Sequence, residues 1–278
     1  MLLTVPSFPA TQAGTLTVQT TSLLGNLLYE NTRTTRFRKE SLGRAAAGWH
    51  YDVTLTDFQQ TEPHGMAQLD ADALALRRQL RLETDATGQL LRVTNKEQLR
   101  THWAALRPQL LRKYQHSADI TPGMIAGLGQ VLDEEGHLED VLRQGVEYGT
   151  LFPALYGQLY NETPTPGPAR VIARFLANAD LPMTTLVQRK LAVPADVAYG
   201  ITVEGKLNGA EYPAEAVRHA LRTMTDQQAL DTTLRLEHRE SYEFDEQHEL
   251  RHAARFTVYG VPGIFMTKTI CTLTAHPA

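Results

Sequence analysis

The order of the secondary-structure signals along the chain constrains its fold more than any other feature. The first sixty residues are rich in Thr, Val, Tyr and Phe, and glycines divide them into runs of strand length. Helix signals follow between residues 95 and 146, and strand signals return from residue 169 onward. Strands and helices do not alternate, so parallel βαβ units are not expected. This order predicts an α+β protein with a large, curved, mainly antiparallel β-sheet and helices packed across one face.

Length and linker signals bear on the number of domains. The chain has 278 residues, and a fold of this size is stable without a metal or a disulfide. The sequence PTPGP at 164–168 is the best linker signal, so a subdomain break could fall near 163–168. A second half that begins in the middle of a sheet is less natural than one shared sheet, so we expect a single domain over 1–278. The two halves share strands and a hairpin, but no repeat recurs at a fixed period.

Charge and cysteine content limit the class of protein. The net charge of -4 argues against a nucleic-acid-binding protein. Cys271 is the only cysteine, so no internal disulfide can form and nothing indicates an oxidising compartment. No run of about 18 apolar residues occurs, so we expect no membrane span. The N-terminus lacks the basic start and apolar run of a secretory signal, and we expect a cytoplasmic protein.

The sequence HELRH at 248–252 has the spacing of a zinc-protease motif. That chemistry requires both histidines on one face of a helix, with the Glu249 carboxylate as general base beside a metal-bound water. The flanking residues instead alternate between apolar and polar at every second position, as strands do. No Asp or Glu follows Glu249 to provide a third ligand. We therefore predict no bound zinc, and an antiparallel hairpin over 231–260 that turns at Asp245 to His248.

The layout of this turn occurs twice in the sequence. The run YEFDEQHELRHAAR has the same order of strand, polar turn and strand as LRLETDATGQLLRV, and Asp245 stands where Asp85 stands. In the earlier run Gly88 can take the left-handed backbone conformation that a tight hairpin needs. The repeated layout supports the interpretation of HELRH as the exit of a hairpin turn.

One register of the predicted hairpin gathers polar side chains on its apolar side. In this register Glu240 faces His252, with His238 two residues away on the same side. His238, Glu240 and His252 would then form a ligand or metal site, or a hydrogen-bonded patch where the sheet opens to water. The patch is the commoner arrangement. This register also places two glutamates opposite each other elsewhere, so a shifted register remains open.

Aromatic residues recur at every fourth position in the segment 147–160. They are Tyr148, Phe152, Tyr156 and Tyr160. This spacing is typical of a buried helical stripe, but two glycines and a proline within the segment weaken a helix there. Because of this conflict, we expect the segment to border the main contact surface, where its rings would bind a ligand or a partner's side chains.

No catalytic constellation emerges from the sequence. It contains no G-x-S-x-G elbow, Walker loop, EF-hand or kinase signature. An apolar sheet face and an irregular aromatic segment favour a non-catalytic binding or interaction protein without a cofactor. It would dock a protein partner, or hold an apolar small ligand between sheet and helices. The alternative is a metal-dependent hydrolase that uses the His248-Glu249-x-x-His252 motif.

Overall fold

The computed structural model describes residues 2–6, 10–62, 64–176, 179–190, 194, 197–225 and 233–276. In these ranges the chain has the predicted α+β fold, with a large antiparallel sheet and helices. One sheet contains twelve strands in the order β6-β5-β4-β3-β2-β14-β13-β12-β11-β10-β8, and β9 also pairs with β10. A separate two-stranded sheet consists of β1 and β7.

The strands and helices have the following bounds. The strands are β1 (Leu2–Leu3), β2 (Thr11–Leu24), β3 (Leu27–Arg44), β4 (Gly48–Gln60), β5 (Gln79–Asp85), β6 (Leu90–Val93), β7 (Gln158–Leu159), β8 (Thr165–Pro166), β9 (Arg170–Leu176), β10 (Ala179–Arg189), β11 (Tyr199–Leu207), β12 (Arg235–Phe244), β13 (Leu250–Val261) and β14 (Phe265–His276). The helices are α1 (Gly65–Arg77), α2 (Lys96–Lys113), α3 (Pro122–Asp133), α4 (His137–Gln144), α5 (Val146–Leu151) and α6 (Ala214–Thr225).

The chain forms two compact units, each built from segments that are distant in the sequence. Unit 1 comprises Met1–Leu3, Val18–Glu30 and Gln158–Thr272, and unit 2 comprises Thr4–Thr17, Asn31–Gly157 and Leu273–Ala278. The strands β2, β3 and β14 each contribute residues to both units. Within the linker-like sequence at 164–168, Thr165 and Pro166 form β8, which pairs with β10.

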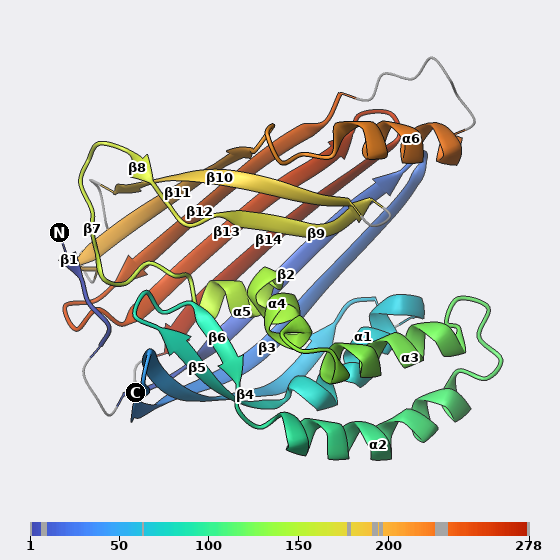
Figure 1. The fold of residues 1–278 in the computed structure, drawn as a ribbon, viewed down its shortest axis with the longest axis horizontal. Coiled ribbons are helices and arrows are strands. Elements are labelled where there is room, and N and C mark those ends of the chain that lie inside the picture. The colour runs from blue at the N-terminus through green and yellow to red at the C-terminus, as the bar shows by residue number, and fades with distance from the viewer. Residues whose placement is uncertain are drawn as a thin grey trace. The chain divides into compact units, whose positions relative to one another are not determined.

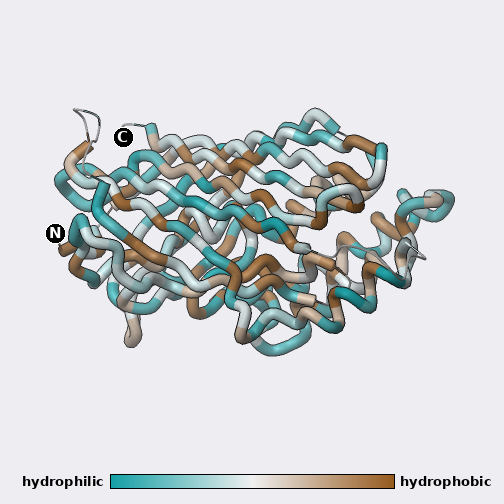
Figure 2. Tube along the Cα trace, turned by 90° about the horizontal axis from the view of Figure 1, so that it is seen from above, coloured by the Kyte–Doolittle hydropathy of each residue, from teal (hydrophilic) through white to brown (hydrophobic). Residues whose placement is uncertain are grey.

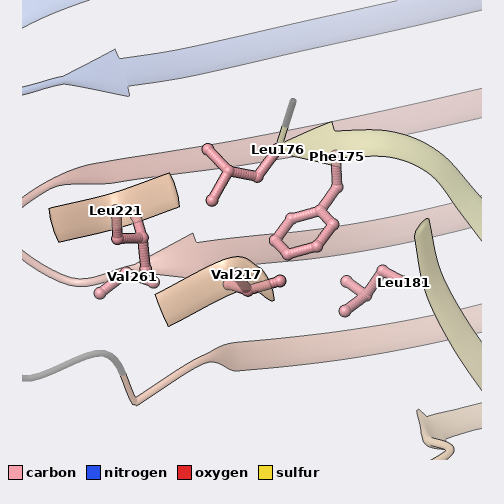
Figure 3. Packing of buried hydrophobic residues seen from close by; sticks show 6 residues of the cluster. All are labelled: Phe175, Leu176, Leu181, Val217, Leu221 and Val261. Atoms are coloured by element: carbon pink, nitrogen blue, oxygen red, sulfur yellow. The ribbon is translucent and has the colours of Figure 1, made fainter. Parts of the chain in front are cut away.

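Unit 1 contains the antiparallel strands β10 to β13, which lie side by side in Figure 1. Along β11 the residues from Ile201 to Lys206 change between apolar and polar, and the coloured trace of the whole chain shows repeated changes of this kind (Figure 2). Helix α6 connects β11 to β12 and packs on the strands through Val217 and Leu221. Figure 3 shows these side chains pointing toward residues of β9, β10 and β13 in one apolar cluster. Its members are Phe175, Leu176, Leu181, Val217, Leu221 and Val261.

Among its described residues, unit 2 contains β4, β5 and β6 together with the five helices α1 to α5. The hydroxyl of Thr121 accepts a hydrogen bond from the Met124 N–H, and Pro122 occupies the first turn, so α3 begins where these residues favour a helix start. Helices α1, α2 and α3 bury apolar side chains against one another. These are Leu69, Leu110, Ile120 and Ile125, with Ile120 directly before Thr121, the N-cap of α3.

The same succession of elements occurs in both units. β3-β4-α1-β5-β6 has the order of β10-β11-α6-β12-β13, and the neighbouring strands pair in the same sequence. Trp49 pairs with Thr84 one residue before the end of β5, and Tyr199 pairs with Phe244 at the end of β12. The separation between equivalent residues differs along the chain, because the connections differ in length. This explains why no fixed period is visible in the sequence.

The two equivalent hairpins also share an irregularity. In the β5–β6 pair the register shifts between Glu83 and Thr84, and in the β12–β13 pair it shifts between Glu243 and Phe244. Both shifts stand directly before the aspartate that starts the turn, and each corresponds to a β-bulge in the second strand. Shared strand order, register and bulge identify a structural duplication within the chain.

Candidate functional site

The hairpin that carries HELRH is present, which confirms the predicted turn. The Asp245 N–H donates to the Glu249 carbonyl at 3.0 Å, and His248 has a left-handed backbone with φ 63°. His252 lies in β13. The first two residues of the predicted range, 231–232, lie outside the described residues. A turn and a strand do not place the two histidines on one helix face, so the zinc-protease arrangement does not form.

The register of this hairpin differs from the predicted one. Glu240 pairs with Arg255, and His252 pairs with Glu243, so the predicted opposition of Glu240 and His252 is wrong. Phe244 pairs with Leu250 across a five-residue turn, and the bulge beside Phe244 adds one more residue to the second strand, so the pairing of Glu240 moves to Arg255. Because strand side chains alternate between faces, His252 lies on the face opposite Glu240. The structure therefore brings His238 and Glu240 together and leaves His252 apart.

A buried group of charged and polar side chains surrounds the Glu240 carboxylate in unit 1. We call it the Glu240 cluster, and it comprises Arg170, His238, Glu240, Tyr242 and Arg255. Arg170 donates to both carboxylate oxygens, from Nε at 2.9 Å and from Nη2 at 2.8 Å. Nε of Arg255 lies 3.1 Å from Oε1, and the hydroxyl of Tyr242 donates to Oε2 at 3.0 Å. Nε2 of His238 completes the group at 3.0 Å from Oε1.

Close backbone packing holds the His238 ring in this cluster. Gly205 lies directly opposite His238 on β11, and a Cβ atom at Gly205 would be 2.8 Å from Cδ2 of the ring. On the other side, Nδ1 of His238 lies 2.8 Å from the hydroxyl of Thr257. An ionised carboxylate can only accept, so Nε2 carries the proton toward Glu240. The Thr257 hydroxyl can then donate to Nδ1, and a neutral imidazole satisfies both contacts.

Burial and charge act in opposite directions on these groups. Burial alone would raise the pKa of Glu240, but the charges of Arg170 and Arg255 and the hydrogen bond from His238 lower this pKa well below its usual range. Burial alone would lower the pKa of Arg170, but the Glu240 carboxylate raises it. The pKa of Tyr242 is raised, first by burial and then by the negative charge of Glu240. The cluster therefore holds its carboxylate ionised and its phenol protonated.

The structure buries all four rings of the predicted aromatic segment. Tyr148, Phe152, Tyr156 and Tyr160 are each less than one tenth exposed, so the expectation that they border a contact surface with exposed rings is wrong. Their ligand-binding role remains a prediction. Helix α5 ends at Leu151, and the segment continues without regular structure before β7.

Each ring of this segment that lies in unit 2 has a specific neighbour. The Tyr148 hydroxyl donates to the Arg77 carbonyl at 3.1 Å. The Phe152 ring meets the Tyr51 ring edge-on, with centroids 5.4 Å apart. The Tyr156 ring covers the glycine of the β5–β6 turn, where a Cβ atom would be 2.6 Å from Cδ2. Glycine and proline interrupt the helix here. The rings are buried instead by contacts with residues that are distant in the sequence.

Exposed apolar residues gather at the turn between β2 and β3, in unit 1. We call this surface the apolar tip, and it comprises Leu23, Leu24, Leu27, Leu28 and Tyr29. Leu27 and Leu28 are the most exposed, at 73% and 63%. The turn contacts the β13–β14 turn, because the Gly25 N–H donates to the Ile264 carbonyl at 2.8 Å.

Sequence reasoning missed part of both candidate sites. The Leu-Leu-Gly-Asn-Leu-Leu run at the β2–β3 turn was a readable signal, since a tight turn flanked by leucine pairs must expose some of them. Arg255 could have been found from the correct register, in which it lies opposite Glu240. Arg170 had no local signal, because it reaches Glu240 from β9, which lies 70 positions earlier in the chain.

No family model, curated protein or solved structure matches this chain. Within the described ranges, no helix is long and apolar enough to cross a membrane. The same residues hold no group of three or more His, Cys, Asp or Glu that could bind a metal ion. The geometry of the described residues is therefore the basis for proposals about function.

Proposed function

We propose that this chain is a non-catalytic interaction protein that docks a protein partner through the apolar tip. The observation that carries this proposal is the concentration of exposed large apolar side chains at one turn. Among the described residues, five of the thirteen exposed large hydrophobic side chains lie within positions 23–29. Single exposed apolar residues are ordinary, whereas several of them at one turn commonly mark an interaction site.

The tip residues contribute little to the folding core. Leu24, Leu27 and Leu28 are each more than half exposed, so their side chains gain little free energy from burial in this chain. The strands that carry them lie inside the sheet, between β4 and β14, and the pairing of β3 with β4 begins at Arg33, beyond the tip. We propose that a partner binds through burial of the exposed leucine side chains.

The chemistry around the tip fits a partner with an apolar surface. The sequence from 11 to 29 contains no Asp, Glu, Lys, Arg or His, and neither does the sequence from 256 to 267, which includes the adjoining β13–β14 turn. Charged residues are depleted at the centres of protein interfaces because their desolvation is costly. Tyr29 adds an aromatic ring, which interfaces favour.

Site-specific photo-crosslinking tests this proposal. A photoreactive side chain at position 27 should form an adduct with one defined protein in a lysate of the source cells. The same group at position 42 is the matched control, because Leu42 is also an exposed strand leucine but lies outside the tip. The adduct protein, once purified, should bind the wild-type chain directly.

Two variants then connect the binding to the tip. Replacing Leu27 and Leu28 together by Ser should weaken binding of the purified partner at least about tenfold, since anchor residues contribute about 1–2 kcal/mol or more each. Leu42→Ser should leave affinity unchanged, and all variants should keep wild-type thermal stability. Equal adducts at both positions, an adduct with a second copy of this chain, or affinity indifferent to the tip variant would refute the proposal.

A further inference from the structure

Strand β6 stands at one end of the large sheet, where an open edge would expose backbone hydrogen-bonding groups. Among the described residues, β6 pairs with β5 alone. An unpaired edge is a template for strand addition by another chain, and proteins commonly protect such an edge. In this chain two side chains of α4 bond to the backbone of β6.

The hydrogen bonds between β5 and β6 show which backbone groups of β6 point outward. The Thr94 N–H donates to a carbonyl of β5 at 2.8 Å, so the preceding N–H, that of Val93, points away from β5. The Gln89 carbonyl accepts from an N–H of β5 at 2.9 Å, so the next carbonyl, that of Leu90, also points away. Both outward groups lie where a further strand would pair.

Helix α4 provides partners for these two groups from residues one turn apart. The Val93 N–H donates to Oε1 of Glu139 at 2.9 Å. Nη1 of Arg143 donates to the Leu90 carbonyl at 3.2 Å. Residues four apart lie on the same face of a helix, so one face of α4 presents both an acceptor and a donor. These two side chains make hydrogen bonds that a neighbouring strand would otherwise make.

Burial and charge hold the Glu139 side chain against β6. Glu139 is only 3% exposed, and Leu138 and Leu142 of α4 are buried beside it in the sequence. Nζ of Lys96 lies 2.8 Å from Oε2 of Glu139. Burial alone would raise the pKa of Glu139, but the Lys96 ammonium and the Val93 N–H lower this pKa. The carboxylate is therefore ionised at neutral pH, which strengthens its hydrogen bond to β6.

The duplication within the chain shows that the β6 edge is suited to a strand. In unit 1 the strand β13 corresponds to β6, and it has β14 as its second neighbour. Val93 pairs with Leu82, which lies three residues before the turn aspartate of β5. Ala253 pairs with Tyr242 at the same place in β12, so Ala253 is the equivalent of Val93. The equivalent edge thus pairs with a strand in one copy and is covered by a helix in the other.

We propose that α4 is a guard of the β6 edge, which prevents a second copy of this chain from adding its own β6 strand there. A strand can pair with a copy of itself about a two-fold axis, so every molecule carries a matching strand. The β6 sequence Leu90–Val93 contains no proline that would prevent such pairing. The guard is independent of the apolar tip, and either proposal can fail without the other.

Hydrogen exchange at the Val93 amide tests whether Glu139 closes the edge. In dilute protein, exchange at Val93 should be at least about tenfold faster in Glu139→Ala than in wild type, the effect of losing a hydrogen bond to a charged acceptor. Glu135→Ala is the matched control, since Glu135 is exposed and precedes α4, and it should leave this rate unchanged. The Val53 amide of the interior strand β4 should exchange more slowly than Val93 in Glu139→Ala, because it reports global unfolding. Unchanged exchange at Val93 would overturn the proposal.

Light scattering over a range of protein concentrations tests what the guard prevents. Glu139→Ala should self-associate at least about tenfold more tightly than wild type, and Glu135→Ala should match wild type. As the associated form fills, exchange at Val93 in Glu139→Ala should become slow again, because a strand of the second copy then binds its N–H. Arg143→Met removes the donor to Leu90 and should shift association in the same direction, which covers the case in which Glu139→Ala folds poorly. Self-association equal to wild type in both variants, or association that leaves exchange at Val93 fast, would also contradict the guard.

Discussion

Asp85 and Asp245 hold two hairpin turns with the same hydrogen bonds. The Oδ1 atom of Asp85 accepts from the backbone N–H groups two and four residues later, at 2.8 and 2.9 Å. Oδ1 of Asp245 accepts from the corresponding two N–H groups at 2.9 Å each. The residue in the left-handed conformation is Gly88 in the first turn and His248 in the second. The same pair of aspartate hydrogen bonds thus closes both hairpins, and only the second hairpin contains the histidine motif.

Replacing Asp245 by Ala should destabilise the protein by about 2–3 kcal/mol, because two backbone N–H groups and the Arg251 guanidinium lose an acceptor. Asp245→Asn keeps an oxygen at the Oδ1 position and should cost less than Asp245→Ala. Urea unfolding followed by circular dichroism measures both free energies. An Ala variant as stable as wild type would show that the carboxylate does not hold the turn.

The stability of His248 variants should depend on backbone strain at this position and not on metal binding. A left-handed conformation costs a non-glycine residue about 1–2 kcal/mol, so His248→Gly should be neutral or stabilising even though its ring contact with Tyr199 is lost. His248→Val should be destabilising, since a β-branched side chain is least compatible with positive φ. Thermal unfolding of both variants is the measurement. A His248→Gly variant less stable than His248→Val would contradict this order.

The Glu240 carboxylate should make stability depend on pH at the acid end. Its pKa in the folded protein lies well below the usual value of 4.5, so its contribution is present above pH 4.5 and is lost as pH falls below it. At neutral pH, Glu240→Gln should cost about 3–5 kcal/mol, because buried arginines lose their counter-charge. Urea unfolding at pH 7 and at successive lower pH values should show the two proteins converging. A difference that stays constant down to pH 3 would refute the assignment.

Truncating Phe152 should lower the stability of the folded protein, because its ring packs in the core and not on a contact surface. Phe152 is buried against Tyr51, so Phe152→Ala should lower the free energy of unfolding by about 3–5 kcal/mol. Leu42→Ala is a control in the same unit, and its exposed side chain should change stability by less than about 0.5 kcal/mol. Denaturant unfolding of the two variants checks the contrast. A small loss in Phe152→Ala would return the aromatic segment to the candidates for a contact surface.

The sequence alone determined those features that depend on neighbours along the chain. Alternation from Leu236 to Phe244 identified β12, and the polar turn at Asp245 predicted a hairpin in place of a zinc-binding helix. Side-chain direction in a strand repeats every two residues, and an aspartate can hold a turn through its own backbone. Such signals act over a few residues, so they can be read before any tertiary contact is known. The order of strands and helices gave the α+β class for the same reason.

Only the tertiary structure decided which residues meet across strands. The five-residue turn and the bulge beside Phe244 moved the register so that Glu240 faces Arg255 and His252 turns away. Alternation fixes the face on which a side chain lies, but it does not fix the partner, and one extra residue exchanges the faces of everything beyond it. Arg170 of β9 reaches the cluster by a hydrogen bond to the Glu240 carboxylate, and no local sequence pattern indicates such a distant contact. Burial of the aromatic segment was decided in the same way, because packing against distant residues overrode the glycines and proline that weaken its helix.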